Sequence, residues 1–373
     1  MNDKVKTCTN CILSEEDTKY ISFDNNGQCN YCNYYYSAVG ALGNTETKKA
    51  FLKNKIAEMI KNKGSHGYDC ILGVSGGVDS TFLAYWAKQN GLNPLVVHFD
   101  NGWNSELAVK NIENICSKLN YQLNTYVINW EEFKELQLSY FRAGVIDIEV
   151  LTDHAIHAIL YKIAKKYKIK YILNGNNLAT EAIMPKDWVY DKNDWRNIKD
   201  IYSKFGRGKS IKTFPHTTFI QKQFNYWLFK LENLEILNYI DYNKESAKEL
   251  IKRELRWIDY GGKHYESVFT KFYQSYILPV KFGVDKRKAH LATLICSKQM
   301  TRGEAHEILK LPVFDEKEII SDKEYVCKKL GLSETEFDNL MKEKPRSHSE
   351  FKNEKELWTN YFKFISILKF WKR

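Results

Sequence analysis

The stretch Ile71–Ser80, which reads ILGVSGGVDS, decides the fold of this 373-residue chain. Its apolar first half runs directly into the Ser-Gly-Gly of residues 75–77, and a helix is predicted to begin near Asp79. Two adjacent glycines let the backbone turn tightly and approach a ligand closely, because no Cβ stands in the way. Exposed amides and a helix N-terminus attract anions, and the two serines add hydroxyl donors. The stretch therefore predicts a phosphate-binding loop between a strand and a helix.

Strands and helices are predicted to alternate around this loop. Apolar strands are predicted at 70–74, 94–99, 121–128 and 171–173, with helices at 80–89 and 106–119 and two more helical stretches that end by residue 168. Strict alternation implies βαβ units and a parallel sheet with right-handed crossovers. The predicted fold class is therefore α/β, with a parallel-sheet core.

The sequence divides into four predicted segments. They are a metal-binding ribbon at 1–44, a connector at 45–67, the α/β core at 68–222 and a helical region at 223–373 that completes the active site. Within the core, residues 178–222 are irregular and rich in aromatic side chains. Such an insertion after a sheet strand is typical of a lid or a substrate loop.

Composition indicates an ordered globular protein. Hydrophobic residues make up 43% of the chain, and 56 basic against 46 acidic side chains give a formal charge of +10 without a long basic block. A phosphate-rich small ligand explains this charge as well as nucleic acid does, and nucleic acid is not favoured. No export signal or membrane-spanning stretch is recognised, so we expect a cytoplasmic protein that does not bind membranes.

Four of the eight cysteines are spaced as metal ligands. Cys8, Cys11, Cys29 and Cys32 form two CxxC pairs separated by a hairpin-length loop, which suits tetrahedral coordination of zinc. Four protein ligands leave no open position, so a structural Zn²⁺ is expected. An iron–sulfur cluster with the same ligands is the alternative. The other four cysteines lack flanking glycines and are interpreted as small buried apolar residues.

Polar loops follow the second and fourth predicted strands, at the sheet edge where parallel sheets bind ligands. The first contains Asp100, and the second reads NGNNLATE from Asn174 to Glu181. Aspartate and asparagine beside glycine also form simple turns, so that interpretation stays open. The candidates for nucleotide binding are Ser75, Gly76, Gly77, Val78, Asp79, Ser80, Asp100, Asn174, Gly175 and Asn176, and Asn177 and Glu181 are candidates for substrate contact.

Two further groups of residues are candidates on weaker grounds. Asp153 and His154 lie at a predicted helix start, where helix capping and substrate contact are equally good explanations. Lys286 and Arg287, within KFGVDKRKAH, could neutralise a triphosphate or departing pyrophosphate, because fixed cations stabilise a leaving group that gains negative charge. A solvated basic helix face explains the same pattern.

The motif SGGxDS resembles the signature of the PP-loop ATP pyrophosphatases and lacks the lysine of a Walker loop. Members of that family cleave ATP between its α- and β-phosphates and form an adenylated intermediate. The resemblance implies ATP and Mg²⁺ as cofactors. It also implies that the loop amides, Ser75 and Ser80 hold pyrophosphate, and that Asp79 helps to position Mg²⁺.

With the CxxC pairs, FDNGW, NGNNLATE, GGKHYES and FGVDKRKAH, the chain resembles the N-acetyl sugar amidotransferase family of bacterial surface-glycan and nonulosonic acid pathways, including those of flagellin glycans. The matching segments run from Cys8 to about Arg302. The resemblance implies conversion of an acetamido group on an N-acetyl sugar, expected to be nucleotide-linked, into an acetamidino group. Lys263, Glu266 and Lys286 are expected to hold the activated amide, and Asp79 and Arg287 complete the catalytic candidates.

No glutaminase nucleophile is recognised, since no cysteine is N-terminal or lies in a glycine-flanked elbow. The family resemblance implies separate glutaminase and ammonia-conducting subunits similar to histidine-biosynthesis enzymes. The second candidate function is a PP-loop tRNA sulfurtransferase, which would require a reactive cysteine near the phosphate loop. A third is a zinc-ribbon binding module with a degenerate nucleotide fold.

Overall fold

The core of the fold is a five-stranded parallel sheet with the strand order β3-β2-β1-β4-β5. The computed structural model describes residues 5–208, 210–262 and 265–370. The strands are β1 (Ile71–Gly73), β2 (Leu95–Asp100), β3 (Leu123–Val127), β4 (Tyr171–Leu173) and β5 (Glu232–Leu234). Every pairing between neighbours is parallel, which confirms the predicted α/β class.

One strand of this sheet was not predicted. β5 pairs with β4 through Tyr171↔Glu232 and Leu173↔Leu234, although it lies in the segment predicted to be helical. It is three residues long and exposes two polar side chains partly or fully, so it has no hydrophobic pattern to recognise. The sheet therefore takes its last strand from beyond residue 222.

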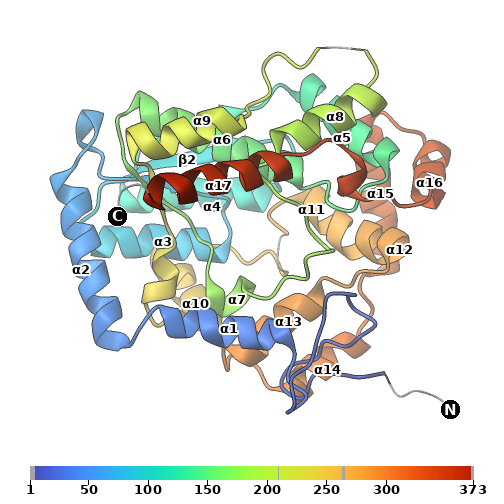
Figure 1. Cartoon of the computed structure of the whole chain (residues 1–373), viewed down its shortest axis with the longest axis horizontal. Helices are drawn as coiled ribbons and strands as arrows, with labels where there is room; N and C mark the ends of the chain where they lie inside the picture. Colours follow the sequence, from blue (N-terminus) through green and yellow to red (C-terminus); the bar gives the residue numbers. More distant parts are fainter. Residues whose placement is uncertain (1–4, 209, 263–264, 371–373) are drawn as a thin grey trace.

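Helices cover both faces of the sheet (Figure 1). Ile71 and Val97 pack in one core, while Leu72 and Val96 pack in the other, as expected for successive side chains of a strand. The second core is completed by α2 (Thr45–Lys61), α3 (Val78–Gln89), α4 (Glu106–Leu119) and α10 (Lys244–Leu255). The first contains α5 (Trp130–Ala143), α6 (Val150–Lys166), α8 (Trp195–Phe205), α11 (Val268–Phe272), α12 (Leu278–Phe282), α15 (Glu316–Leu330) and α16 (Glu334–Lys342).

Local sequence signals set the bounds of these helices. Ser105 accepts a hydrogen bond from the Ala108 amide at the start of α4, and Asn129 accepts one from Glu132 at the start of α5. α5 ends at Gly144, whose φ of +64° is the left-handed conformation that glycine adopts without strain. α2 occupies the predicted helical connector.

Residues 178–222, which the sequence predicts to be a lid-like insertion, are packed against the core of the fold. They contain α7 (Leu178–Glu181), α8 and α9 (Phe219–Phe224). Trp188, Ile198 and Phe214 are at most 3% exposed and belong to the same core as the sheet. Glu132 of α5 accepts backbone hydrogen bonds from residues 212–214. The aromatic side chains therefore fill the core.

The N-terminal unit packs against a C-terminal helix pair. Thr7↔Ser14 and Phe23↔Cys29 form isolated antiparallel bridges, after which α1 (Asn30–Ala41) begins. The unit contacts α13 (Arg287–Cys296) and α14 (Arg302–Lys310), which lie beside α1 in Figure 1. The beginning of the chain is thus joined to residues almost 300 positions further on.

The last helix, α17 (Lys355–Phe370), lies beside α9 (Figure 1). The rings of Phe219 and Trp358 are 4.9 Å apart, and the indole of Trp227 donates to the Tyr361 hydroxyl at 2.9 Å. The remaining described elements are short: η1 (Ser65–Gly67), η2 (Asn225–Phe229), η3 (Ile236–Tyr239), η4 (Tyr273–Ile277) and η5 (His348–Glu350). Over the described ranges, no helix combines the length and apolar character needed to cross a bilayer.

Replacing Ile201 of α8 by alanine is expected to lower the free energy of unfolding by about 2–5 kcal/mol, because the side chain is fully buried. Urea denaturation measures this change. The matched control is Ile220→Ala in the same segment, whose side chain is 77% exposed and whose loss is expected to cost less than about 0.5 kcal/mol. Equal effects of the two substitutions would show that α8 is not part of the cooperative core.

Candidate active site and metal centre

The phosphate loop needs both of its glycines. Gly76 has a φ of +83°, and a Cβ on it would lie 2.6 Å from the carbonyl oxygen of Ala108. A Cβ on Gly77 would lie 3.3 Å from the hydroxyl of Tyr260. The Trp257 indole donates to the Gly76 carbonyl at 2.8 Å. The loop is therefore shaped by α4 on one side and by residues 257–260 on the other.

The first turn of α3 is open to an anion. Gly77 is its N-cap residue and offers no side-chain acceptor, unlike the serine and asparagine caps of α4 and α5. The amides at the start of a helix need an acceptor, and an anion also interacts favourably with the helix dipole. Ser75 and Ser80 hold the loop together, since the Ser80 hydroxyl accepts from the Ser75 amide at 3.3 Å and the Ser75 hydroxyl accepts from the Gly77 amide at 3.2 Å.

Asp79 joins the phosphate loop to the loop after β4. Its carboxylate accepts hydrogen bonds from the Tyr242 hydroxyl and from the Asn177 side chain, the latter at 3.3 Å. Burial and the nearby charge of Asp79, with a smaller contribution from Glu181, raise the pKa of Tyr242. Asp79 and Glu181 therefore act on the same phenol and offer the oxygen ligands that Mg²⁺ prefers.

Among the other predicted polar residues, several build turns. Asp100 accepts from the Gly102 amide at 2.8 Å, and Asn174 accepts from the Asn176 amide at 3.1 Å. Asn177 caps α7 by accepting from the Thr180 amide at 2.9 Å. Gly175 is packed so closely that a Cβ would lie 3.1 Å from the Ser80 amide nitrogen. Gly175 therefore packs the loop after β4 against the start of α3, while Asp100, Asn174 and Asn177 hold the shape of their own loops.

The segment that follows Tyr260 lies over the phosphate loop. Burial comes first among the causes that raise the pKa of Tyr260, followed by the charges of Glu266 and Asp79. The Ser105 amide donates to the Glu266 carbonyl at 2.9 Å, and the Val268 amide donates to the Trp103 carbonyl at 2.9 Å. Glu266 is thus brought to the nucleotide side of the fold, while Lys263 lies outside the described residues.

Arg287, a predicted site residue, has a structural role. The Arg287 guanidinium is paired with Asp285, at 2.8 Å from Nη2 to Oδ2, and donates to the carbonyls of Leu311 and Pro312. With its donors engaged in this way, Arg287 is not the phosphate-neutralising cation that the sequence predicts. It fixes the start of α13 against the loop after α14.

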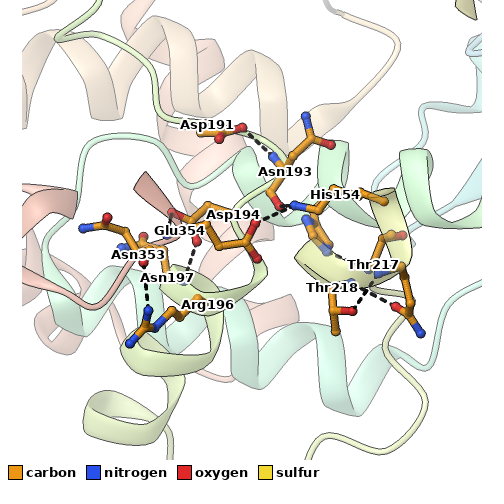
Figure 2. Close-up of polar contacts among 12 residues, drawn as sticks. His154, Asp191, Asn193, Asp194, Arg196, Asn197, Thr217, Thr218, Asn353 and Glu354 are labelled. Carbon is orange, nitrogen blue, oxygen red and sulfur yellow. Dashed lines mark hydrogen bonds and ion pairs between the residues drawn. The ribbon is translucent and has the colours of Figure 1, made fainter. Parts of the chain in front are cut away.

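His154 is a buried structural histidine (Figure 2). Its Nε2 accepts from the Thr217 amide at 3.2 Å, so Nδ1 donates to the Lys192 carbonyl at 2.9 Å. Burial lowers its pKa to about 3, which keeps the ring neutral. The predicted contact with substrate is therefore not supported for His154, whereas its neighbour Asp153 has a side chain that is 42% exposed.

Figure 2 also shows polar contacts of Asp194, Asn197 and Glu354, which hold the chain that follows Lys192 in place. Asp194 accepts from the Glu354 amide at 3.0 Å and caps α8 through the Asn197 amide at 2.9 Å. Asn197 in turn donates to the His348 carbonyl at 2.9 Å. The turn that carries Lys192 is therefore fixed by residues from the C-terminal part of the chain.

A cluster of five charged residues lies at the N-terminus of α6 and includes Lys286, at the N-cap of α13. The Lys192 ammonium is 2.7 Å from an Asp147 oxygen and 3.2 Å from an Asp153 oxygen. Glu149 accepts from the Thr270 hydroxyl at 2.9 Å. α6 runs back across the sheet before β4, so its N-terminus lies at the carboxyl edge of the strands. A hydrogen bond agrees with this position: Asn101, directly after β2, donates to Thr152 of α6 at 3.3 Å. We call Asp147, Glu149, Asp153, Lys192 and Lys286 the charged cluster.

The members of the charged cluster differ in their pKa values. Burial, reinforced by the charge of Asp153, raises the pKa of Glu149 to about 7. Burial also lowers the pKa of Lys286, against the opposing charge of Asp147. Burial acts in the raising direction on Asp147 as well, but the charge and hydrogen bond of Lys192 outweigh it and lower the pKa.

Sequence reasoning missed Asp147, Glu149 and Lys192. The available signal was the segment Val145–Val150, in which acidic residues alternate with apolar ones. A carboxylate inside an apolar run needs a partner or a function, because burying a charge is costly. Its partner Lys192 lies more than 40 residues away in sequence and could not be paired with it by pattern alone.

The four predicted metal ligands come together as a buried cluster. The Sγ atoms of Cys8, Cys11, Cys29 and Cys32 all lie within 4.8 Å of one another. Cys8 and Cys32 are 3.8 Å apart, Cys11 and Cys29 are 3.7 Å apart, and Cys29 and Cys32 are 3.6 Å apart. A single tetrahedral ion with sulfur at about 2.3 Å requires sulfurs roughly 3.8 Å apart. The thiols therefore fit one tetrahedral metal ion.

The four thiols are linked to α13, the helix that has Lys286 as its N-cap residue. Cys296, interpreted from sequence as a plain core residue, lies with Sγ 3.5 Å from Cys32 Sγ, and Asn10 donates to both sulfurs at 3.3 Å. Lys288 pairs with Asp17, which also accepts a 2.9 Å hydrogen bond from the Trp188 indole at its carbonyl. The N-terminal unit thus holds α13 and the chain before α8 in one position.

Comparison with known proteins matches two parts of the chain to families. Residues 69–173 match the family of queuosine biosynthesis protein QueC, and residues 266–366 match the family described as LPS biosynthesis protein WbpG-like, C-terminal domain. The two matches support a protein of the PP-loop superfamily. More particularly, the α/β core is similar to the QueC family and the C-terminal part is similar to the WbpG-like type.

Among curated relatives, tRNA(Ile)-lysidine synthase of Chlamydia pneumoniae is 38% identical over 64 residues, which are 17% of this chain and 20% of that protein. tRNA-specific 2-thiouridylase MnmA 2 of Fusobacterium nucleatum is 25% identical over 193 residues, 48% of this chain and 49% of the relative. The chain thus spans half or less of the length of these relatives. The U34-tRNA thiolase NcsA of Methanococcus maripaludis, a solved structure with a [4Fe-4S] cluster, is 13% identical, with 70% of this chain and 80% of that chain covered and a TM-score of 0.29.

Gly76→Ala is expected to weaken nucleotide binding by more than about tenfold, because the new Cβ would force the loop away from Ala108 at a left-handed φ. Titration calorimetry with a non-hydrolysable ATP analogue measures the affinity. The control is Gly91→Ala, which has the same strained sign of φ, at +70°, but open space around the Cβ. Retained affinity in Gly76→Ala would contradict the shape assigned to the loop.

Cys29→Ser is expected to reduce the metal content well below one ion per chain and to loosen the packing of the N-terminal unit on α13, because the sulfur ligand is lost. Elemental analysis of the purified protein gives the stoichiometry. Cys116→Ser on α4 is the control and should leave the metal content unchanged. An unchanged metal content in Cys29→Ser would rule out the four-cysteine site.

Proposed function

We propose that the chain is an ATP-dependent amidotransferase that modifies an N-acetyl sugar. It adenylates the oxygen of the acetamido group and replaces it with ammonia to give an acetamidino group, AMP and pyrophosphate. The observation that carries the proposal is the junction of the two family matches. The WbpG-like match begins at Glu266, and the structure lays the chain around Glu266 over the phosphate loop of the PP-loop core.

The residues around the phosphate loop suit the first half of this reaction. The open first turn of α3 would bind the phosphates of ATP, and Asp79 with Glu181 would hold Mg²⁺ against them. Mg²⁺ would supply positive charge that neutralises the phosphates. An amide oxygen is a poor leaving group, and its transfer to AMP makes it a good one. Fixed donors around the phosphates stabilise the charge that develops during this transfer.

The sugar is expected to be nucleotide-linked and to belong to a bacterial surface polysaccharide or flagellin glycan pathway, such as those of lipopolysaccharide or pseudaminic acid. The support for this context is the WbpG-like match, whose family description names lipopolysaccharide biosynthesis. The proposed location is the cytoplasm, where nucleotide-linked sugars and ATP are made. Zinc is the metal proposed for the four thiols, since their spacing fits a single tetrahedral ion better than the larger frame of an iron–sulfur cube.

Ammonia is proposed to come from separate glutaminase and ammonia-conducting subunits, because Cys70, Cys116 and Cys327 do not suit a glutaminase nucleophile and Cys296 lies buried beside the thiol cluster. Burial raises the pKa of Cys116 to about 11 and that of Cys327 to about 11, and burial also raises the pKa of Cys70. The thiolate is the reactive form of cysteine, and such shifts suppress it near neutral pH.

The second candidate, a tRNA sulfurtransferase, is favoured by the match to tRNA-specific 2-thiouridylases. It would require a reactive thiol beside the phosphate loop. Cys70, the nearest cysteine in sequence, is fully buried at the start of β1 beneath the loop. The environment of Cys70 therefore supports sugar amidation over sulfur transfer.

The proposal predicts ATP turnover when the enzyme is supplied with an ammonium salt and the correct nucleotide-linked N-acetyl sugar. AMP, pyrophosphate and sugar mass are followed together across a panel of such sugars, and the sugar should show the small mass loss of exchanging oxygen for NH. Asp79→Ala should keep its fold and lower pyrophosphate release by about 10²-fold or more, because its carboxylate would no longer hold Mg²⁺. AMP formation only with tRNA and a sulfur donor would establish the second candidate instead.

A further inference from the structure

The charged cluster contains a group that no function above has used. Glu149 sits at the N-cap of α6, and its Oε2 accepts the hydroxyl of Thr270. Its neighbour Asp153 is one turn along the same helix and is partly open to solvent. Lys286 reaches the cluster from α13, and in the described part of the chain no hydrogen bond or ion pair engages its ammonium group. The cluster is therefore crowded with charge and incompletely paired.

Glu149 differs from the other carboxylates of the cluster in its partner. The Lys192 ammonium pairs with Asp147 and Asp153, whereas Glu149 accepts its hydrogen bond from the neutral hydroxyl of Thr270, and no ion pair engages it among the described residues. A buried carboxylate without a paired cation is stabilised when it takes up a proton. Replacing an amide oxygen by ammonia releases such a proton.

We propose that Glu149 accepts the proton released when ammonia attacks the adenylated acetamido carbon. This inference rests on the proposed amidotransferase function. As ammonia forms the new C–N bond, the π electrons of the bond between the adenylated carbon and the protonated sugar nitrogen move onto that nitrogen. The added nitrogen is then positively charged and passes one proton to the Glu149 carboxylate. The C–O bond breaks, its electron pair leaves with AMP, and a nitrogen lone pair forms the C=N bond of the amidinium.

The position of the charged cluster fits this order of events. It lies at the carboxyl edge of the sheet, on the face covered by α6, and the phosphate loop opens into α3 on the other face at the same edge. Thr270, which orients Glu149, follows Glu266 by four residues in the segment that covers the loop. A substrate bound between the phosphate loop and the charged cluster would meet ATP on one side and Glu149 on the other.

Groups from every neighbouring element act on Glu149. The acidic and basic groups are Asp153 on its own helix, Asp147 before it, Lys192 before α8 and Lys286 at α13, and the phenol of Tyr273 on η4 is within electrostatic range. Because burial and Asp153 raise the pKa of Glu149 to about 7, the carboxylate form is present above that pH and is lost as the pH falls through it. The amidation rate at a fixed concentration of free NH₃ should therefore fall below about pH 7.

The test compares Glu149→Gln with wild type in two partial reactions. Pyrophosphate exchange into ATP, measured with the sugar but without ammonia, should stay within about twofold of wild type, because adenylation does not use Glu149. Acetamidino formation should fall by about 10²–10⁴-fold, and its rate should no longer decrease as the pH falls below about 7. Glu149→Asp should restore part of the rate and a dependence of the rate on pH, since it restores a carboxylate. Glu307→Gln, an exposed residue on α14, is the matched control and should resemble wild type.

Three outcomes would overturn the inference. Glu149 would be excluded as the proton acceptor if Glu149→Gln formed the acetamidino product at the wild-type rate. The same conclusion would follow if the rate of the variant still fell below about pH 7, or if pyrophosphate exchange and amidation were lost equally. Failure of wild type to form an acetamidino product from any N-acetyl sugar would instead defeat the proposed function, and this inference with it. The two failures are distinguished by the wild-type mass measurement.

Discussion

The hydrogen bond from the Trp257 indole to the Gly76 carbonyl is the contact on which the site depends. It joins the C-terminal half of the chain to the phosphate loop. At Gly76 that loop has a left-handed backbone conformation that favours glycine. Asn111 reinforces the contact by donating to the Ile258 carbonyl at 2.9 Å and accepting from the Ile258 amide at 2.7 Å. Residues 257–260 thus lie beside the phosphate loop, and Glu266 lies near it as well, with a carboxylate oxygen 3.7 Å from the position of a Cβ on Gly77.

The predictable part of the structure is the part in which sequence neighbours act together. The strand, glycine turn and helix of Ile71–Ser80 are contiguous, and the CxxC pairs carry their spacing in the sequence. The four parallel strands from β1 to β4 were found because apolar runs alternate with helical periodicity. β5 could not be found in this way, because its three residues owe their conformation to the exposed edge of β4.

The individual roles of polar residues were less predictable, because each depends on distant partners. Arg287 and His154 were reasonable candidates by residue type, yet Asp285 with two carbonyls engages the first, and Thr217 with Lys192 engages the second. Glu149 was overlooked because its neighbours in sequence are apolar. The residues that set its pKa come from α6, the chain before α8, α11 and the start of α13. No local pattern contains that information.

The contact between the metal-binding unit and α13 has a consequence for biosynthesis. Asn10 and Cys296, which meet beside the thiol cluster, are separated by 286 positions. During translation the N-terminal unit leaves the ribosome well before α13 and α14, which supply part of the hydrophobic cluster that contains Ile12 and Leu13. A metal ion bound early would keep the short unit compact during that interval. The ion would then stabilise the unit until the helices that complete its cluster have been synthesised.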